Sequence, residues 1–127
     1  MKNNDYVRYF KYNYVLIARV KEILILDNFI KEKIYLLNNG DTITDKCIIK
    51  YNSDIRKLIN EKDIIEYEFY GIYNIMSVNR NENGIFFFGE DEDGDLITLK
   101  DVNIISVLPH EVFEIKKYKI EKENEYE

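Results

Sequence analysis

The chain of 127 residues has one cysteine, one histidine and one proline, and it has no tryptophan. A single cysteine, Cys47, cannot form a disulfide within the chain, which excludes the disulfide framework of small secreted scaffolds. Cys47 lies in an apolar segment that we interpret as a core strand. A single histidine, His110, excludes a histidine-rich metal site, and its place after Pro109 indicates a surface residue at the start of a helical turn.

Motifs of the common enzyme classes are also absent from the sequence. It contains no glycine loop of the Walker or dinucleotide-binding type, no CxxC pair and no GxSxG motif. No apolar run approaches the roughly 18 residues of a membrane span. The first eleven residues mix charges with tyrosines and form no signal-peptide core. We therefore expect a soluble, cytoplasmic protein that is not an enzyme and binds no cofactor, no metal and no membrane.

Alanine is nearly absent as well, whereas isoleucine occurs 20 times and tyrosine 11 times. Alanine is the best helix former, while β-branched and aromatic side chains suit pleated, half-buried strands. This composition predicts an all-β fold that is mainly antiparallel.

Two parts of the sequence match one another at a fixed spacing. A shift of 58 positions places residues 5–9 over residues 63–67, and it also pairs Tyr12 with Tyr70 and Val20 with Val78. A shift of 54 positions then places NGDTIT, which begins at Asn39, over DGDLIT, which begins at Asp93. A repeat of this length favours two copies of one small β unit.

Short strands alternate with turn signals in both copies. Residues 38–41 and 81–84 tolerate positive φ and predict hairpin turns, and residues 52–59 predict a short helical turn. Five short strands with one helical turn near the end are the plan of an SH3-like barrel. The second copy is expected to end with a helical turn at Val112 and Phe113 and a last strand at Tyr118 and Ile120.

We therefore predict two tandem SH3-like small barrels. The first module spans residues 1–60, the second spans residues 61–120, and residues 121–127 form a charged tail. The alternative is a single larger sandwich, which the halfway repeat disfavours.

The net charge of −6 is unevenly distributed. Through Asn60 there are eleven Lys and Arg against seven Asp and Glu, which gives +4. From Glu61 onward there are seven against seventeen, which gives −10. This asymmetry is informative about partners and carries no information about the fold.

The densest acidic cluster has five acids among six residues, from Glu90 to Asp95. Its spacing does not fit a calcium loop of the EF-hand type, which has a glycine at position six and a glutamate at position twelve. Counted from Glu90, the glycine of this segment is at position five and Asp101 is at position twelve. One interpretation is a solvated hairpin turn; the other is a negative patch that mimics nucleic-acid phosphate and binds a basic groove. The candidate partner-binding residues are Glu90, Asp91, Glu92, Asp93 and Asp95.

Basic and aromatic residues interleave near the N-terminus, at Arg8, Tyr9, Lys11 and Tyr12. Such a face on an SH3-like barrel can stack bases and hold phosphates, so these four residues are a possible nucleic-acid face. Strand alternation would place Tyr9 and Tyr12 on opposite sides. The alternative is therefore a set of strand tyrosines in the core, with lysines at the surface.

Three segments carry a resemblance to a known type of protein: NDYVRYF with VLIARVKEI near the N-terminus, the link from Ile48 to Asp63, and the strand from Ile104 followed by Glu111 and Phe113. Over residues 4–120 the chain resembles small prophage and mobile-element proteins of low-GC bacteria, which have tandem SH3-like modules and include proposed anti-CRISPR inhibitors of the RNA-guided type VI-A ribonuclease. The chain departs from the pattern at Lys62, where related proteins tend to have the glycine of Gly-Asp-Tyr-Val.

The resemblance implies a non-catalytic phage or mobile-element protein that acts in the host bacterial cytoplasm. It would inhibit a bacterial defence protein or ribonucleoprotein complex by binding it, with anti-CRISPR as the implied class. One alternative is a nucleic-acid-binding tandem SH3-like protein that uses the basic first copy. Another is a structural adaptor of a phage or mobile element.

Overall fold

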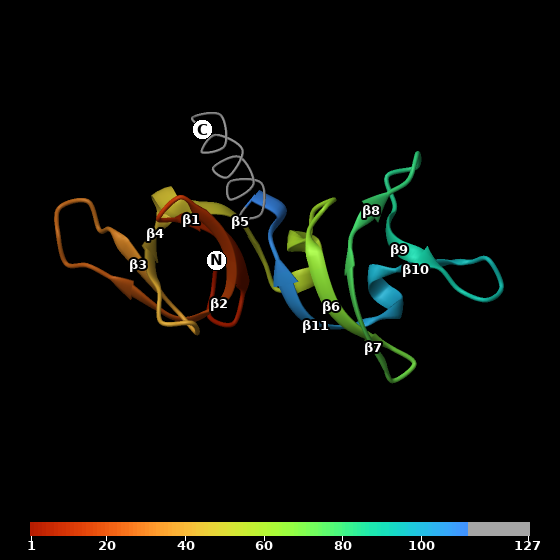
Figure 1. Ribbon diagram of the computed structural model, residues 1–127. Coiled ribbons are helices and arrows are strands. Elements are labelled where there is room, and N and C mark those ends of the chain that lie inside the picture. The colour runs from red at the N-terminus through yellow and green to blue at the C-terminus, as the bar shows by residue number, and fades with distance from the viewer. Residues whose placement is uncertain (112–127) are drawn as a thin grey trace, which may run out of the picture. The chain divides into compact units, whose positions relative to one another are not determined.

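The computed structural model of the chain describes residues 1–111 and consists mostly of antiparallel β-strands (Figure 1). This confirms the prediction of a β-rich, mainly antiparallel fold. The chain divides into a first unit, Met1–Leu58, and a second unit, Ile59–Glu127. The helical turn expected at Val112 and Phe113, the strand expected at Tyr118 and Ile120, and the tail at 121–127 lie outside the described residues.

The first unit is a five-stranded sheet in the order β4-β3-β2-β1-β5. Its elements are β1 (Tyr6–Lys11), β2 (Tyr14–Ile25), β3 (Lys33–Leu37), β4 (Thr42–Thr44), the 3-10 turn η1 (Asp45–Cys47), β5 (Ile48–Asn52) and the 3-10 turn η2 (Ile55–Leu58). The long strand β2 pairs with β1 through its first half and with β3 through its second half, so the sheet curls (Figure 1).

The second unit repeats this order. Its elements are β6 (Ile64–Phe69), β7 (Ile72–Ser77), β8 (Asn79–Arg80), β9 (Phe86–Glu90), β10 (Leu96–Thr98), the 3-10 turn η3 (Leu99–Asp101) and β11 (Asn103–Leu108). The sheets are β11-β6-β7 and β10-β9-β8. β7 and β8 flank the single residue Val78, and together they occupy the place that β2 has in the first unit.

The two units share their unusual backbone conformations, which explains the spacing of the repeat. The β1–β2 turn has positive φ at Tyr12 (53°) and Asn13 (67°), and the β6–β7 turn has positive φ at Tyr70 (50°) and Gly71 (77°). Two consecutive residues with positive φ are the requirement of a type I′ hairpin turn, whose twist matches that of the paired strands.

The residue before each repeated aspartate also has positive φ. It is Asn4 (73°) in the first unit and Lys62 (76°) in the second. Lys62 is the position at which related proteins were expected to have glycine. The chain therefore keeps the left-handed conformation there without the residue that adopts it at least cost.

Each unit buries its own apolar cluster. The first contains Val7, Tyr9, Ala18, Val20, Tyr35, Leu37 and Ile43. The second contains Ile59, Ile65, Tyr67, Val78, Phe88 and Val102. Full burial of one such side chain stabilises the fold by about 1.5 to 3 kcal/mol. The two clusters correspond in sequence, since the shift of 58 places Val7, Tyr9 and Val20 over Ile65, Tyr67 and Val78.

A buried aspartate closes the start of each unit. Asp5 Oδ2 accepts a hydrogen bond from the amide of Lys2 at 3.1 Å, and Asp63 Oδ2 accepts one from the amide of Asn60 at 2.8 Å. Backbone bonds repeat as well, since the amide of Val20 donates to Asp5 O and that of Val78 to Asp63 O, each at 2.8 Å. The aspartate with which the repeat begins is thus a buried loop cap that accepts hydrogen bonds from backbone amides of the preceding loop.

Cys47 differs from its expected place. It ends the turn η1 instead of lying in a strand, and it is partly buried against the first core cluster. The strand β5 begins one residue later because the 3-10 turn extends to Cys47. Within residues 1–111 the structure contains no helix with the length and apolar character needed to cross a membrane.

Candidate functional site

The acidic cluster forms the turn between β9 and β10. Asp91 Oδ1 accepts hydrogen bonds from the amides of Asp93 and Asp95, both at 2.9 Å, and Gly94 has φ of +82°. Asp91 therefore stabilises the turn, as expected from the interpretation of this cluster as a solvated hairpin turn. The side chains of Glu90, Glu92, Asp93 and Asp95 are exposed.

Part of this cluster lines a pocket of about 360 Å³, which we call the acidic pocket. Its lining residues are Phe69, Tyr70, Asp91, Asp95, Leu96, Ile97 and Asp101. The rings of Phe69 and Tyr70 meet edge to face, with centroids 4.6 Å apart, and Tyr70 is 91% exposed. Three carboxylates beside an open aromatic ring form a site that suits a cation.

Asp101 contributes a fixed negative charge to this pocket. Its Oδ2 accepts hydrogen bonds from the backbone amide and the hydroxyl of Thr98, both at 2.9 Å, in a capping box at the start of η3. These bonds, and the backbone bond first, lower the pKa of the Asp101 carboxyl below its usual value. Asp101 is therefore ionised at neutral pH.

The first unit shows what a cation does at the corresponding place. Its β3–β4 turn has the same backbone bonds, since the amide of Leu37 donates to Asp41 O at 2.9 Å and that of Asp91 donates to Asp95 O at 2.8 Å. Lys11 Nζ lies 3.5 Å from Asp41 Oδ1 and donates to Thr42 O at 3.3 Å. The ammonium group thus occupies the first unit's own turn.

Tyr9 contacts the same carboxylate from the core side. Its hydroxyl donates to Asp41 Oδ2 at 2.5 Å and accepts from Asn39 Nδ2 at 2.7 Å. Burial, together with this bond to Asp41, raises the pKa of Tyr9 to about 12. In the second unit the matching Tyr67 donates to Met76 Sδ instead, at 3.4 Å, and Phe69 stands in the position of Lys11. Among residues 1–111, no lysine or arginine lines the acidic pocket.

The residues of the possible nucleic-acid face do not share one exposed surface. Arg8 and Tyr9 have no exposed area, and Arg8 Nη1 donates to the carbonyl of Leu58 at 3.0 Å inside the first unit. Lys11 is partly buried, and Tyr12 is 78% exposed with Lys11 Nζ 5.2 Å from its ring centroid. Alternation along β1 and the closure of the unit around Arg8 account for this separation.

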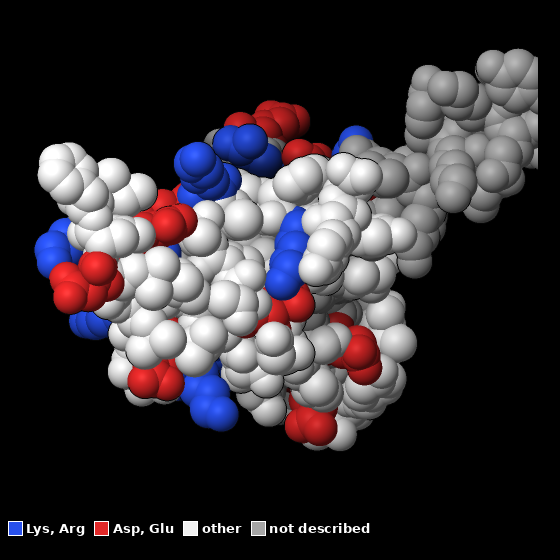
Figure 2. Space-filling view, turned by 90° about the vertical axis from the view of Figure 1, so that its left-hand side faces the viewer, with Lys and Arg blue, Asp and Glu red and all other residues white. Residues whose placement is uncertain are grey.

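The surface around the β2–β3 hairpin also has no patch of purely positive or purely negative charge. Figure 2 shows the side of the molecule on which this hairpin lies in Figure 1, and charged residues of both signs are scattered there among neutral side chains. Such a surface lacks the continuous positive potential of a nucleic-acid interface.

Among residues 1–111, one group of side chains could in principle hold a metal ion. It consists of Asp63, His110 and Glu111, whose potential ligand atoms lie within 4.8 Å of one another. The carboxylate of Asp63 already accepts bonds from the amides of Asn60 and His110 at 2.8 and 2.9 Å, and His110 Nδ1 lies 3.0 Å from Asp63 Oδ1. The arrangement is a hydrogen-bonded cap. His110, expected at the surface, is partly buried because this cap holds its ring.

Sequence reasoning located the acidic turn and missed the rest of the acidic pocket. Phe69, Tyr70 and Asp101 were not candidates, because they come from the end of β6, the β6–β7 turn and η3, which are distant from the acidic turn in the sequence. The repeat contained a usable signal, since the shift of 58 pairs Lys11 with Phe69 and so shows that the cation is missing from the second copy.

Comparison of the chain with protein-family models, with curated proteins and with solved structures gives no significant match.

Proposed function

We propose that the protein is a non-catalytic inhibitor of a bacterial defence complex, of the anti-CRISPR class, encoded by a prophage or mobile element. It binds through the acidic turn and acidic pocket of the second unit to a basic, nucleic-acid-binding surface of its target. A lysine or arginine side chain of the target enters the acidic pocket. The resemblance supports the class, and the pocket supports the mode of binding.

The observation that carries this proposal is the difference between Lys11 and Phe69. The first unit fills its turn with its own ammonium group. The pocket beside the matching turn of the second unit is lined by three carboxylates and an exposed tyrosine and, among residues 1–111, by no lysine or arginine. An incoming ammonium or guanidinium group would complete the second turn as Lys11 completes the first. The neighbouring acids Glu92 and Asp93 would steer a basic surface toward it.

We further propose that each unit is an SH3-like barrel. Support comes from the strand order β4-β3-β2-β1-β5, from a long second strand shared by both parts of the sheet, and from a 3-10 turn before the last strand. The second unit repeats the strand order and the 3-10 turn before the last strand, with β7 and β8 in the place of the long second strand. Small barrels of this kind present their turns to partners and leave the core to hold the fold.

The proposal is tested with purified RNA-guided nuclease complexes of several types. The protein should co-elute with one of them and suppress its cleavage of target nucleic acid. The double variant Glu92→Lys/Asp93→Lys should weaken inhibition by about tenfold or more, because it reverses two exposed charges beside the pocket without touching the carboxylate of Asp91 that holds the turn.

The matched control is Glu68→Lys/Glu82→Lys, which makes the same charge change at exposed acids that do not line the acidic pocket. It should retain inhibition. An equal loss of inhibition in both double variants would show that only the net charge of the protein matters, and it would contradict the proposed site. If the protein co-elutes with none of the complex types and suppresses cleavage by none of them, the inhibitor function is contradicted.

One observation favours a second candidate function, that of a structural adaptor. The β2–β3 hairpin extends from the sheet of the first unit (Figure 1) and exposes Ile25 by 63%, Phe29 by 104% and Ile30 by 74%. Exposed apolar side chains grouped at one hairpin are typical of a protein contact. Phe29→Ser/Ile30→Ser would abolish partner binding if the adaptor function holds, and would leave inhibition through the acidic pocket intact.

A further inference from the structure

The strand β7 forms one edge of the sheet β11-β6-β7 in the second unit (Figure 1). Within residues 1–111 it pairs with β6 and with no second strand. In an antiparallel pair, the amide and carbonyl groups of alternate residues face away from the partner strand. The amide of Val78 donates to Asp63 O at 2.8 Å, so the even-numbered residues bond toward β6. The backbone groups of Tyr73, Ile75 and Ser77 therefore face the open edge.

β7 lacks the features that normally protect an edge strand. Such strands are kept short, or they carry a bulge or a charged residue. Among the other edge strands of residues 1–111, β4, β8 and β10 have three residues or fewer, β5 carries Lys50, and β11 has a register shift between Ile104 and Ser106. β7 has six residues, a continuous register with β6 and no charged side chain. The uncharged stretch extends from Tyr70 through Val78.

The side chains of β7 are also open to contact. Four of the six are large, apolar and exposed by 41% to 66%, namely Ile72, Tyr73, Ile75 and Met76. The first unit buries the matching stretch, since the shift of 58 places the buried residues Val15 and Ala18 at the positions of Tyr73 and Met76. Exposed apolar residues grouped on an unpaired strand indicate a contact with another chain.

Asn38 closes the corresponding edge in the first unit. The amide of Arg19 donates to Asn38 Oδ1 at 3.0 Å, and the amide of Asn38 donates to Arg19 O at 2.9 Å. Arg19 matches Ser77 by the shift of 58, and Asn38 matches Glu92 by the shift of 54. Among residues 1–111 no such pair of bonds joins Glu92 to Ser77, so the second unit leaves this edge open.

We propose that β7 pairs antiparallel with β7 of a second copy of the chain, with a two-fold axis at Ile75. The open backbone groups require an extended strand as the occupant, and the absence of charge favours an apolar one. An axis at Ile75 sets its outward-facing groups against those of its copy, and those of Tyr73 against those of Ser77. Each tyrosine ring then lies across from a small side chain, and two β-branched side chains meet at the centre. The strand is therefore complementary to itself.

The charges near the two ends of β7 favour the antiparallel arrangement. Tyr70, which lines the acidic pocket, precedes the strand, and the exposed Arg80 follows it. An antiparallel pair brings the Arg80 end of one strand beside the acidic end of the other, whereas a parallel pair would set one acidic pocket beside the other. A second copy thus offers both an uncharged centre and a cation for each acidic end. This contact does not depend on the proposed function.

The first test is the mass of the full-length protein in solution, measured by sedimentation equilibrium over a range of concentrations. We expect twice the mass of one chain at high concentration. Ile75→Lys should raise the dissociation constant about tenfold or more, because it places two ammonium groups face to face. Ile75 is exposed and lies opposite Glu66 on β6, so the folded unit accommodates the new charge. Ile105→Lys is the matched control, since Ile105 is equally exposed on the bulged strand β11, and it should leave the mass unchanged.

A cross-link tests the register. In a Cys47→Ser background, Ile75→Cys should form a disulfide between two copies with oxidised glutathione, because the Cα atoms of a hydrogen-bonded antiparallel pair lie about 5.5 Å apart. Tyr73→Cys should form none, because four residues along the strands, about 14 Å, separate it from its copy.

Three results would overturn the proposal: the mass of one chain at every concentration, equal effects of Ile75→Lys and Ile105→Lys, or equal cross-linking of the two cysteine variants. If the protein stays monomeric and Ile75→Lys instead loses binding to a target complex, the occupant of this edge is a strand of the target and not a second copy.

Discussion

The two units use one backbone turn for opposite purposes. In the first unit, the turn between β3 and β4 closes on itself: Tyr9 and Lys11 both contact Asp41. In the second unit, the turn between β9 and β10 keeps the backbone bonds, and its carboxylates line an open pocket. The comparison teaches that the same backbone turn can be structural or available for binding. The outcome depends on the acids that the turn carries and on whether the neighbouring strand supplies a lysine, as at Lys11, or a phenylalanine, as at Phe69.

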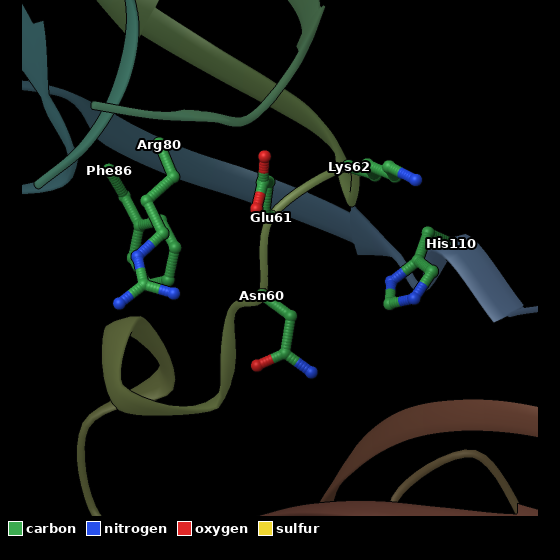
Figure 3. Close-up of a pocket in the computed structure, with 6 residues that line it drawn as sticks. All are labelled: Asn60, Glu61, Lys62, Arg80, Phe86 and His110. Carbon is green, nitrogen blue, oxygen red and sulfur yellow. The ribbon is translucent and has the colours of Figure 1, made fainter. Parts of the chain in front are cut away.

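The second unit has another pocket at the opposite end of β6. Phe69, at the end of β6, lines the acidic pocket, whereas Lys62, before β6, lines a pocket with Asn60, Glu61, Arg80, Phe86 and His110 (Figure 3). The duplication kept Tyr9 and Val20 of the core as Tyr67 and Val78, while the polar positions diverged.

The largest expected difference between the units concerns their buried aspartates. Asp63→Ala should destabilise the second unit by about 2 to 4 kcal/mol, since it removes a fully buried carboxylate that accepts from the amides of Asn60 and His110 and contacts the His110 ring. Asp5→Ala should cost the first unit less, since its carboxylate accepts from the amide of Lys2. Urea titration, followed by amide NMR signals of each unit separately, measures both values. Equal costs would show that the His110 contacts add nothing.

The next prediction concerns alkaline pH and the first unit. The folded-state pKa values of Tyr9 and Tyr35 are raised from 10.0 to about 12 by burial and by hydrogen bonds to Asp41 and Asp45. A raised pKa contributes stability below the unfolded pKa, and this contribution is lost as pH rises from about 10 to about 12. The free energy of unfolding of the first unit should fall across this window. Tyr9→Phe should flatten the fall, and an unchanged slope would refute the assignment to Tyr9.

Converting one unit's turn into the other's should alter partner binding. Phe69→Lys supplies the second unit with the lysine of the first, and its ammonium group should occupy Asp95 and weaken target binding about tenfold. Phe69→Gln is the control, because it also removes the ring but adds no charge. Inhibition measurements on both variants separate the two effects, and equal potency would contradict the occupancy argument.

The smallest effect is expected at the type I′ turns. Asn13→Gly should stabilise the first unit by a few tenths of a kcal/mol, because glycine adopts positive φ at less cost than asparagine. Gly71→Ala should destabilise the second unit by about 1 kcal/mol for the same reason. Thermal unfolding of the two variants gives the comparison. A destabilising Asn13→Gly would mean that the asparagine side chain contributes to the turn.

The antiparallel β fold and the repeat were predictable because they follow from strand propensity and from left-handed turn positions, which recur at a spacing of 58. The acidic turn was predictable because its residues are contiguous. The burial of Arg8 was not predictable, because its guanidinium group bonds the carbonyl of Leu58, which is 50 positions away in the sequence. The pocket at the start of β6 was missed for the same reason: Lys62 and His110, which both line it, are 48 positions apart, and no local pattern relates them.

The central claim is that the second unit takes from a partner the cation that the first unit supplies itself. An amide NMR titration of the full-length protein with a short lysine-rich peptide tests it directly. Shifts should be confined to the amides of Tyr70, Asp95 and Asp101 and their neighbours, and should vanish in Phe69→Lys. Shifts of equal size at the turn around Asp41, where Lys11 already lies, or persistence of the shifts in Phe69→Lys, would contradict the claim.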